Sequence, residues 1–257
     1  LFGDSIFADN WDRDGESIYD IRAAELYRKK VLQQTHLTSK RPQPSKEDTQ
    51  KIIDIRGISG KYIYMPAQKI KDGSITGIGF GMKPQSEYDV LPTLEKVADA
   101  AIEHNIPIVI KPHPHWQCSW KDTPRIEKVS NRLNRKYKDR YKGQGSFIKI
   151  LDGNTQTFMR NAMFSTSICS ASIIDAILTQ TPVAYTGKTM FYKSKCMKYS
   201  PNIHNLIDDM ICGRYNKPEM KLYQSIALHH LNKRSLHMRH TGVENFKRLQ
   251  YALGEKL

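Results

Sequence analysis

The fold is decided by residues 147–185, which read FIKILDGNTQTFMRNAMFSTSICSASIIDAILTQTPVAY. Short apolar runs alternate here with longer segments of helical periodicity. The expected strands are 147–151, 163–166 and 182–185, and the expected helices are 155–161 and 172–180. Such an order is typical of a parallel sheet whose crossover helices cover both faces. This stretch therefore predicts an α/β protein with a doubly wound, Rossmann-like parallel sheet.

The same alternation extends toward the N-terminus. Residues 106–110 (IPIVI) are short and β-branched, which indicates a strand buried on both faces. The remaining expected elements are a strand at 61–66 and helices at 17–34, 90–105, 123–141, 203–213 and 219–253. Residues 38–50 carry two prolines and no large apolar residue, so they are interpreted as a linker. We therefore divide the chain into an N-terminal helical segment and linker (1–59), a Rossmann-like domain (60–200) and C-terminal helices (201–257).

Composition excludes several classes of protein. The chain has 257 residues, 39% of them hydrophobic and 26% charged, which is the balance of a globular protein. No apolar run reaches the roughly 18 to 20 residues of a membrane span. The first 20 residues lack the basic-then-apolar order of a signal peptide, so a cytoplasmic protein with reduced cysteines is expected. None of the four cysteines forms a CxxC, which excludes zinc ribbons and thioredoxin-type motifs.

The charge balance predicts an anionic partner. Lys and Arg number 40 against 26 Asp and Glu, a net charge of +14. Residues 125–149 hold nine of these cations on a predicted helix and its flank. They are interpreted either as a solvated helix face or as a docking surface for an anionic membrane, which would place the protein peripherally on the inner membrane. No nucleic-acid-binding signature accompanies them, so nucleic acid is not expected as a partner.

Three polar segments follow predicted strands, at the edge where open parallel sheets bind ligands. The first runs from Gln68 to Asp72, the second from Lys111 to His115, and the third from Ser167 to Asp175. Ser170 and Ser172 open a predicted helix, whose free N–H groups suit a phosphate. The alternative interpretation is an ordinary capping box between Ser172 and Asp175.

The other two segments carry a histidine and a carboxylate. Pro112 and Pro114 fix the backbone on either side of His113, which beside Lys111 suits holding a phosphate leaving group. A metal site at His113, His115 and Cys118 lacks a fourth ligand, so neither a metal nor another cofactor is expected. Asp72 is placed to act as a nucleophile or base, although Asp before Gly is also a common turn. The nearby glycines form neither a dinucleotide-binding nor a P-loop motif.

These segments together resemble a known family. Gln68-x-x-x-Asp72, then Lys111-x-His113-Pro114, then Ser170-x-Ser172-x-x-Asp175 before Thr181-Pro182-Val183 and Gly187 are similar to bacterial capsule-polysaccharide glycosyltransferases of the retaining β-Kdo transferase type. The resemblance covers roughly residues 60–195. It implies a GT-B fold, with residues 60–200 binding the donor CMP-Kdo, and a glycan or glycolipid acceptor. Because 59 residues cannot build a second Rossmann half, the N-terminal part is expected to be reduced or the chain to be less than the whole enzyme.

The resemblance also implies roles for individual residues. Asp72 would take the sugar covalently, Gln68 would orient the site, and His113 with Lys111 and Pro114 would bind the CMP phosphate. Ser170 and Ser172 would bind the cytidylate. The family's usual serine after the nucleophile is Gly73 here, with Ser74 one place later. A carboxylate nucleophile gives two inversions and net retention, as in retaining glycosidases.

Two other functions remain open on the residues alone. One is a CDP-glycerol or polyol phosphotransferase of the teichoic acid type, in which His113 would act as base and no covalent sugar adduct would form. The other is a non-catalytic polyanion-binding domain that uses the excess positive charge.

Overall fold

The computed structural model describes residues 28–29, 43–58, 60–70, 89–114, 120–189, 191–192 and 194–234. The elements within the described part, in chain order, are α2 (Lys46–Ile55), β1 (Ile63–Pro66), α4 (Val90–Glu103), β2 (Ile108–Lys111), α6 (Thr123–Lys136), β3 (Ile148–Ile150), α7 (Thr155–Arg160), β4 (Phe164–Ser167), α8 (Ile173–Thr179), β5 (Val183–Tyr185), β6 (Lys198–Tyr199), α9 (Ile203–Ile211) and α10 (Lys217–Arg234). Strands and helices alternate from β1 to β5, as the sequence predicts.

The strands form one parallel sheet with the order β3-β2-β1-β4-β5-β6. The chain builds outward from β1 to β3, crosses back over the sheet through α7, and then builds outward in the other direction from β4. The direction of winding therefore reverses between β1 and β4. In open α/β sheets, the carboxyl ends of the strands at such a switch point are the usual place for a ligand.

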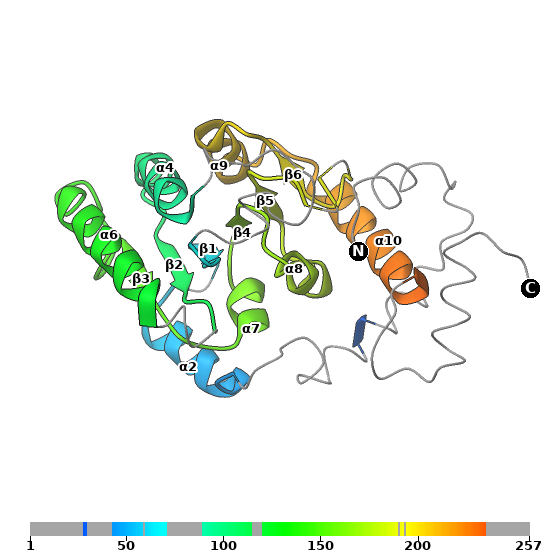
Figure 1. Ribbon diagram of the computed structural model, residues 1–257, viewed down its shortest axis with the longest axis horizontal. Helices are drawn as coiled ribbons and strands as arrows, with labels where there is room; N and C mark the ends of the chain where they lie inside the picture. Colours follow the sequence, from blue (N-terminus) through cyan, green and yellow to red (C-terminus); the bar gives the residue numbers. More distant parts are fainter. Residues whose placement is uncertain are drawn as a thin grey trace, which may run out of the picture.

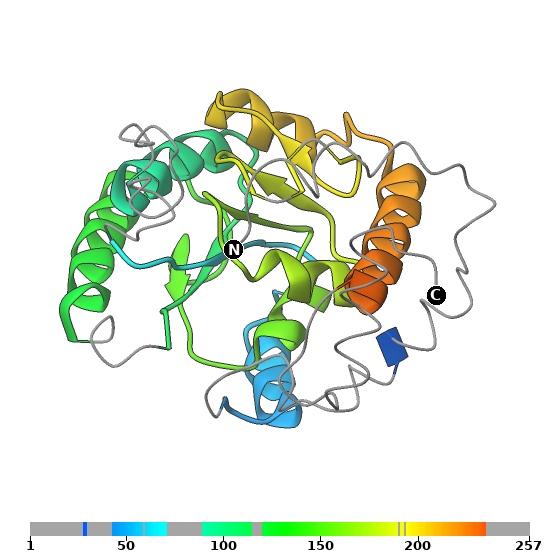
Figure 2. The ribbon, with the colours of Figure 1, turned by 45° about the vertical axis from the view of Figure 1, so that its right-hand side comes forward.

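Helices cover both faces of the sheet, as Figures 1 and 2 show. Alternate residues of each strand point to opposite faces, so Ile63 and Met65 join one core while Tyr62 and Tyr64 join the other. Helices α4, α6 and α9 pack on the first face, and α2, α7, α8 and α10 on the second. The predicted doubly wound α/β fold is confirmed.

Helix α6 presents its cations to solvent. Ile126, Leu133 and Tyr137 are buried against the sheet, whereas Arg125 and Lys128 are exposed. Two of the cations pair with acids of α4, as Arg132 contacts Glu95 and Lys136 lies 3.0 Å from Asp99. The apolar stripe thus faces inward, as predicted, and docking of this face to a membrane stays a prediction.

The structure corrects the predicted linker at 38–50, because residues 46–50 form the first half of α2. Ser45 caps this helix by accepting a hydrogen bond from the Asp48 N–H at 2.9 Å, and Ile53 is fully buried. The strand β6 was not predicted, since two half-buried residues leave almost no pattern. Helix α6 also ends at Lys136, earlier than predicted.

Several expectations fall partly outside the described residues. These are the helix at 17–34 apart from residues 28–29, and the end of the helix at 219–253, of which α10 is the described part. Within the described ranges, no helix combines the length and apolarity that crossing a membrane requires.

Candidate functional site

Gln68 joins the two strand ends at the switch point. It lies two residues beyond β1 and is buried, with 7% of its surface exposed. Its side-chain oxygen accepts hydrogen bonds from the Ser167 hydroxyl at 3.0 Å and from the Cys169 N–H at 2.9 Å. Both donors belong to the end of β4 and the loop that follows it. Gln68, which the family resemblance implies would orient the site, fixes the end of β1 against the end of β4.

The turn between β4 and α8, residues 168–172, is organised by hydroxyl groups. The Ser172 hydroxyl lies 2.8 Å from the Ser170 hydroxyl and 3.1 Å from the Tyr185 hydroxyl, at the end of β5. The Ser170 oxygen also accepts from the Ser172 N–H at 3.2 Å. Ser172 makes no side-chain capping bond to α8, so the alternative interpretation of a capping box is wrong. These hydroxyls instead hold the turn in place and tie it to β5.

Lys111 ends β2 and is buried, with its ammonium group enclosed by polar atoms. Its Nζ donates to the side-chain oxygen of Gln43 at 2.6 Å and to the Thr155 hydroxyl at 2.9 Å. Burial lowers the pKa of Lys111 to about 8, partly offset by the charges of Asp152 and Asp175. In this structure the ammonium therefore ties the end of β2 to the start of α7. Reaching a phosphate, as the sequence predicts, would require it to leave these partners.

Asp175 lies in the first turn of α8, beside the serine turn. Its carboxylate accepts a hydrogen bond from the Gln156 amide at 3.2 Å. Burial raises the pKa of Asp175 to about 6, while the Gln156 hydrogen bond and the charge of Lys111 act in the opposite direction. Asp175 and Lys111 therefore influence each other's charge, and near neutral pH Asp175 is anionic and Lys111 is cationic.

The remaining predicted site residues are placed only in part. His113 and Pro114 follow β2, the strand next to β1, so they lie at the same edge of the sheet as Gln68. His113 is half-buried and Pro114 is exposed. Asp72, the predicted nucleophile, lies outside the described residues, as do His115 and Cys118.

Sequence reasoning missed a fourth polar strand end. The residues after β3 include Asn154, Thr155 and Gln156, and Thr155 and Gln156 contact Lys111 and Asp175 respectively. The rule that singled out the other three segments applies equally to this one, since a polar run follows a predicted strand. Gln43, in contrast, left no such signal because it precedes α2 in the segment interpreted as a linker.

A polar groove of about 350 Å³ lies elsewhere, between the edge strand β3 and α6. None of the predicted site residues lines it. The Asn134 side chain already pairs with the backbone of β3 there. It accepts a hydrogen bond from the Ile148 N–H at 2.7 Å and donates one to the Ile148 carbonyl at 3.0 Å. We therefore place the candidate site at the switch point, where the strand ends converge.

The raised pKa of Asp175 predicts a specific pH dependence of stability. Because folding raises this pKa from 3.8 to about 6, the folded state holds the proton more tightly, and the free energy of unfolding falls as pH rises through that interval. Asp175→Asn keeps an acceptor for Gln156 without the charge. At pH 7 to 8 the variant is expected to be more stable than the wild type by up to about 3 kcal/mol. Urea denaturation at several pH values measures this difference.

The matched control is Asp139→Asn, because Asp139 is exposed near the end of α6. This variant should show the same change in the free energy of unfolding between pH 4 and pH 7 as the wild type. If Asp175→Asn retains the full wild-type pH dependence between 4 and 6, Asp175 is not the group whose proton is held by the fold.

The fold alone defines a class of structure. A six-stranded parallel sheet with helices on both faces is a Rossmann-like α/β architecture, and solved structures with a GT-B fold are similar to it. The sequence itself matches no protein-family model and no curated protein. The likeness is therefore one of fold.

Solved structures give this likeness its detail. A trehalose-6-phosphate synthase, OtsA, aligns with a TM-score of 0.52 and 10% identity over 86% of this chain and 48% of its own. The apo structure of OtsA gives 0.52 and 9% identity over 88% of this chain and 49% of its own. The N-terminal domain of Candida albicans trehalose-6-phosphate phosphatase gives 0.49 and 12% identity over 91% and 48%. The chain spans about half the length of the proteins it resembles.

Proposed function

We propose that this protein is a glycosyltransferase that takes its sugar from a nucleotide-activated donor bound at the ends of β1 and β4. The observation that carries the proposal is the position of Gln68, whose side chain fixes the serine turn against β1 at the switch point. The Ser170 hydroxyl oxygen accepts from Ser172, so its own O–H can donate to a phosphate, and the net charge of +14 favours an anionic ligand. The Rossmann-like fold is compatible with this role.

The finer proposal is CMP-Kdo as donor and a glycan or glycolipid as acceptor. It rests on the sequence resemblance, in which Gln68 and the serine turn belong to one motif set with Asp72. In the proposed reaction, the Asp72 carboxylate attacks the anomeric carbon and the bond to the CMP phosphate oxygen breaks. The acceptor hydroxyl then displaces the carboxylate from the same carbon and loses its proton, so that the sugar is transferred with retention.

The departing CMP needs stabilisation of its negative charge and not a strong acid, because a phosphate is already a good leaving group. His113 and the donors of the serine turn would supply that stabilisation without a metal or another cofactor. Lys111 would contribute a cation at the same edge of the sheet. Its hydrogen bonds to Gln43 and Thr155 make it equally suited to position the neighbouring strand end.

A nucleotide-binding measurement tests the proposal at the serine turn. Calorimetry with CMP is expected to show one site, and Ser170→Ala should weaken the affinity by roughly tenfold, since a hydrogen bond to a charged group contributes about 1.5 to 3 kcal/mol. Ser146→Ala, at an exposed position outside the turn, is the matched control and should bind CMP as the wild type does.

Other outcomes would identify other functions. Binding of UMP in preference to CMP would keep the glycosyltransferase and replace the donor. Affinity that collapses as salt is raised from 50 to 200 mM, with no preference among nucleotides, would favour the polyanion-binding alternative. Equal CMP affinity in the wild type and in folded Ser170→Ala would remove the Ser170 hydroxyl from the nucleotide site.

A further inference from the structure

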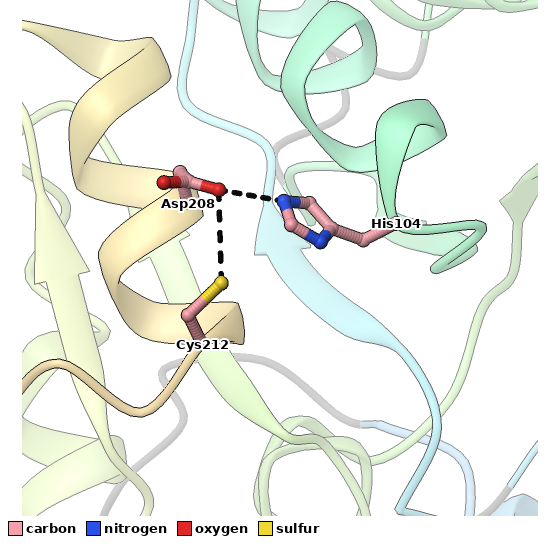
Figure 3. A group of neighbouring side chains, drawn as sticks. All are labelled: His104, Asp208 and Cys212. Carbon is pink, nitrogen blue, oxygen red and sulfur yellow. Dashed lines mark hydrogen bonds and ion pairs between the residues drawn. The ribbon is translucent and has the colours of Figure 1, made fainter.

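The end of α4 meets α9 at a group of three potential metal ligands, drawn in Figure 3. His104 follows α4, Asp208 lies on α9, and Cys212 follows α9. The His104 Nε2 lies 2.6 Å from the Asp208 Oδ1, and the Cys212 Sγ lies 3.8 Å from the same oxygen. All three ligand atoms lie within 4.8 Å of one another. The proposed glycosyl transfer uses none of these residues.

We propose that His104, Asp208 and Cys212 bind one zinc-class divalent cation, with water in the fourth position. An imidazole nitrogen, a carboxylate oxygen and a thiolate sulfur form a mixed set that suits a borderline-soft ion such as Zn²⁺. Mg²⁺ and Ca²⁺ prefer oxygen ligands and are not expected to compete. Three protein ligands are also the number found in zinc sites that keep one open position.

The three ligand separations can be compared with those of a tetrahedral zinc site. The His104 Nε2 and the Cys212 Sγ lie within 4.8 Å of each other, against about 3.6 Å in such a site. With ordinary zinc–ligand lengths, tetrahedral coordination places nitrogen and oxygen about 3.4 Å apart and sulfur and oxygen about 3.6 Å apart. The observed Cys212–Asp208 separation of 3.8 Å is close to the second value. The His104–Asp208 separation of 2.6 Å must open by less than about 1 Å, as the ion replaces the hydrogen bond.

Binding has a simple proton balance. Cys212 gives up its thiol proton to solvent. His104 gives up the Nε2 proton that faces Asp208, to Nδ1 or to solvent, and keeps one proton on Nδ1, so that Nε2 can coordinate. Asp208 supplies an ionised oxygen. The thiolate and the carboxylate together neutralise the two charges of the ion.

An outer shell of charged residues already orients the carboxylate. Arg214 contacts the Oδ2 of Asp208, which leaves Oδ1 facing His104 and Cys212. Arg214 is itself held by Asp209, whose carboxylate lies 2.7 Å from the guanidinium, and Asp209 also pairs with Lys198 at 2.5 Å. Hydrogen-bonded carboxylates of this kind are typical of metal sites, where the outer partners fix the ligand orientation.

The same pair of helices supplies an internal comparison. His204 of α9 lies 3.4 Å from Glu103 of α4, and both side chains are about half exposed, at 49% and 50%. No third ligand joins this pair among the residues that the structure describes. His104 and Asp208 are more shielded, at 27% and 29%, yet remain accessible to an ion from solvent.

The test is Co²⁺ and Zn²⁺ titration of the tag-free full chain after treatment with a chelator. Co²⁺ is expected to bind with one equivalent and to give a thiolate-to-cobalt charge-transfer band together with the strong visible bands of four-coordinate cobalt. Zn²⁺ should displace the Co²⁺ and raise the melting temperature reversibly. Excess Mg²⁺ should not affect the binding of Zn²⁺. Because removal of an outer partner alone costs 10- to 100-fold in metal affinity, Cys212→Ser should lose at least about 100-fold and abolish the charge-transfer band.

Matched variants separate coordination from structure. His204→Gln and Cys169→Ser remove a histidine and a cysteine outside the group and should bind Co²⁺ as the wild type does. Cys212 is exposed, so its serine variant should fold as the wild type does. Absence of tight Co²⁺ binding in the wild type, an unchanged charge-transfer band in Cys212→Ser, or half an equivalent of metal per chain would overturn the proposal and leave an ordinary ion pair between the two helices.

Discussion

Replacing Asp72 with Asn is expected to lower sugar transfer from CMP-Kdo by roughly a thousandfold or more, while CMP affinity changes little. The substitution keeps the shape of the side chain and removes the nucleophilic charge. Asp72 lies four residues beyond Gln68, the residue that fixes β1 to β4 at the switch point. Steady-state transfer assays and CMP calorimetry on the same preparations measure the two effects separately.

Mass spectrometry adds a direct test of the covalent step. The wild type with CMP-Kdo and a slow acceptor should accumulate a protein heavier by one sugar residue, with the adduct on the peptide that contains Asp72. Asp54→Asn, at an exposed position on α2, is the matched control and should transfer normally. Near wild-type transfer by Asp72→Asn would make Asp72 a turn residue. The phosphotransferase alternative, with His113 as base, would then be preferred.

Gln68→Ala is expected to destabilise the protein by about 2 to 4 kcal/mol and to abolish measurable CMP binding. The change deprives the Cys169 N–H of its acceptor and removes packing between the ends of β1 and β4. Each effect lowers the free energy of unfolding. The Ser167 hydroxyl is less affected, because the Pro66 carbonyl lies 3.5 Å away as a second acceptor. Urea denaturation measures the loss of stability.

A second variant, Gln68→Glu, separates the effect on CMP binding from the effect on the stability of the protein. A glutamate oxygen can still accept from Cys169 and Ser167, so both hydrogen bonds should remain, while ionising the buried carboxylate costs part of the stability near neutral pH. Its negative charge would lie beside the proposed phosphate site, so CMP affinity should fall by at least roughly tenfold. Gln144→Ala, at an exposed position, should change neither quantity. If Gln68→Glu binds CMP as tightly as the wild type, the nucleotide phosphate does not lie near this strand end.

The candidate site could be predicted only as a set of strand ends. Gln68, Lys111, Ser170 and Ser172 are all found at the carboxyl edge of the sheet, because a polar residue just after a buried strand has only that edge to occupy. Their partners were not predictable in the same way. Lys111 contacts Gln43, 68 positions away in the sequence, and no local pattern reports a hydrogen bond of that range.

The serine turn shows how a correct position can carry a wrong local interpretation. Ser172 and Asp175 have the spacing of a capping box, and that spacing is all the sequence can report. The structure gives both side chains more distant partners, since Ser172 contacts Tyr185 and Asp175 contacts Gln156. Long-range partners replaced the local one because β5 and α7 lie beside the turn only after the sheet has formed.

By itself, the sequence determined the α/β class, the parallel sheet and the edge at which polar residues gather. These follow from the period of apolar residues, which each segment carries locally. Tertiary structure alone decided the strand order, with its reversal between β1 and β4, and therefore which strand ends meet. It also decided that His104 meets Asp208 and Cys212, because packing of α9 on α4 joins residues more than 100 positions apart. Contacts of that range depend on how helices and strands dock, which no local pattern encodes.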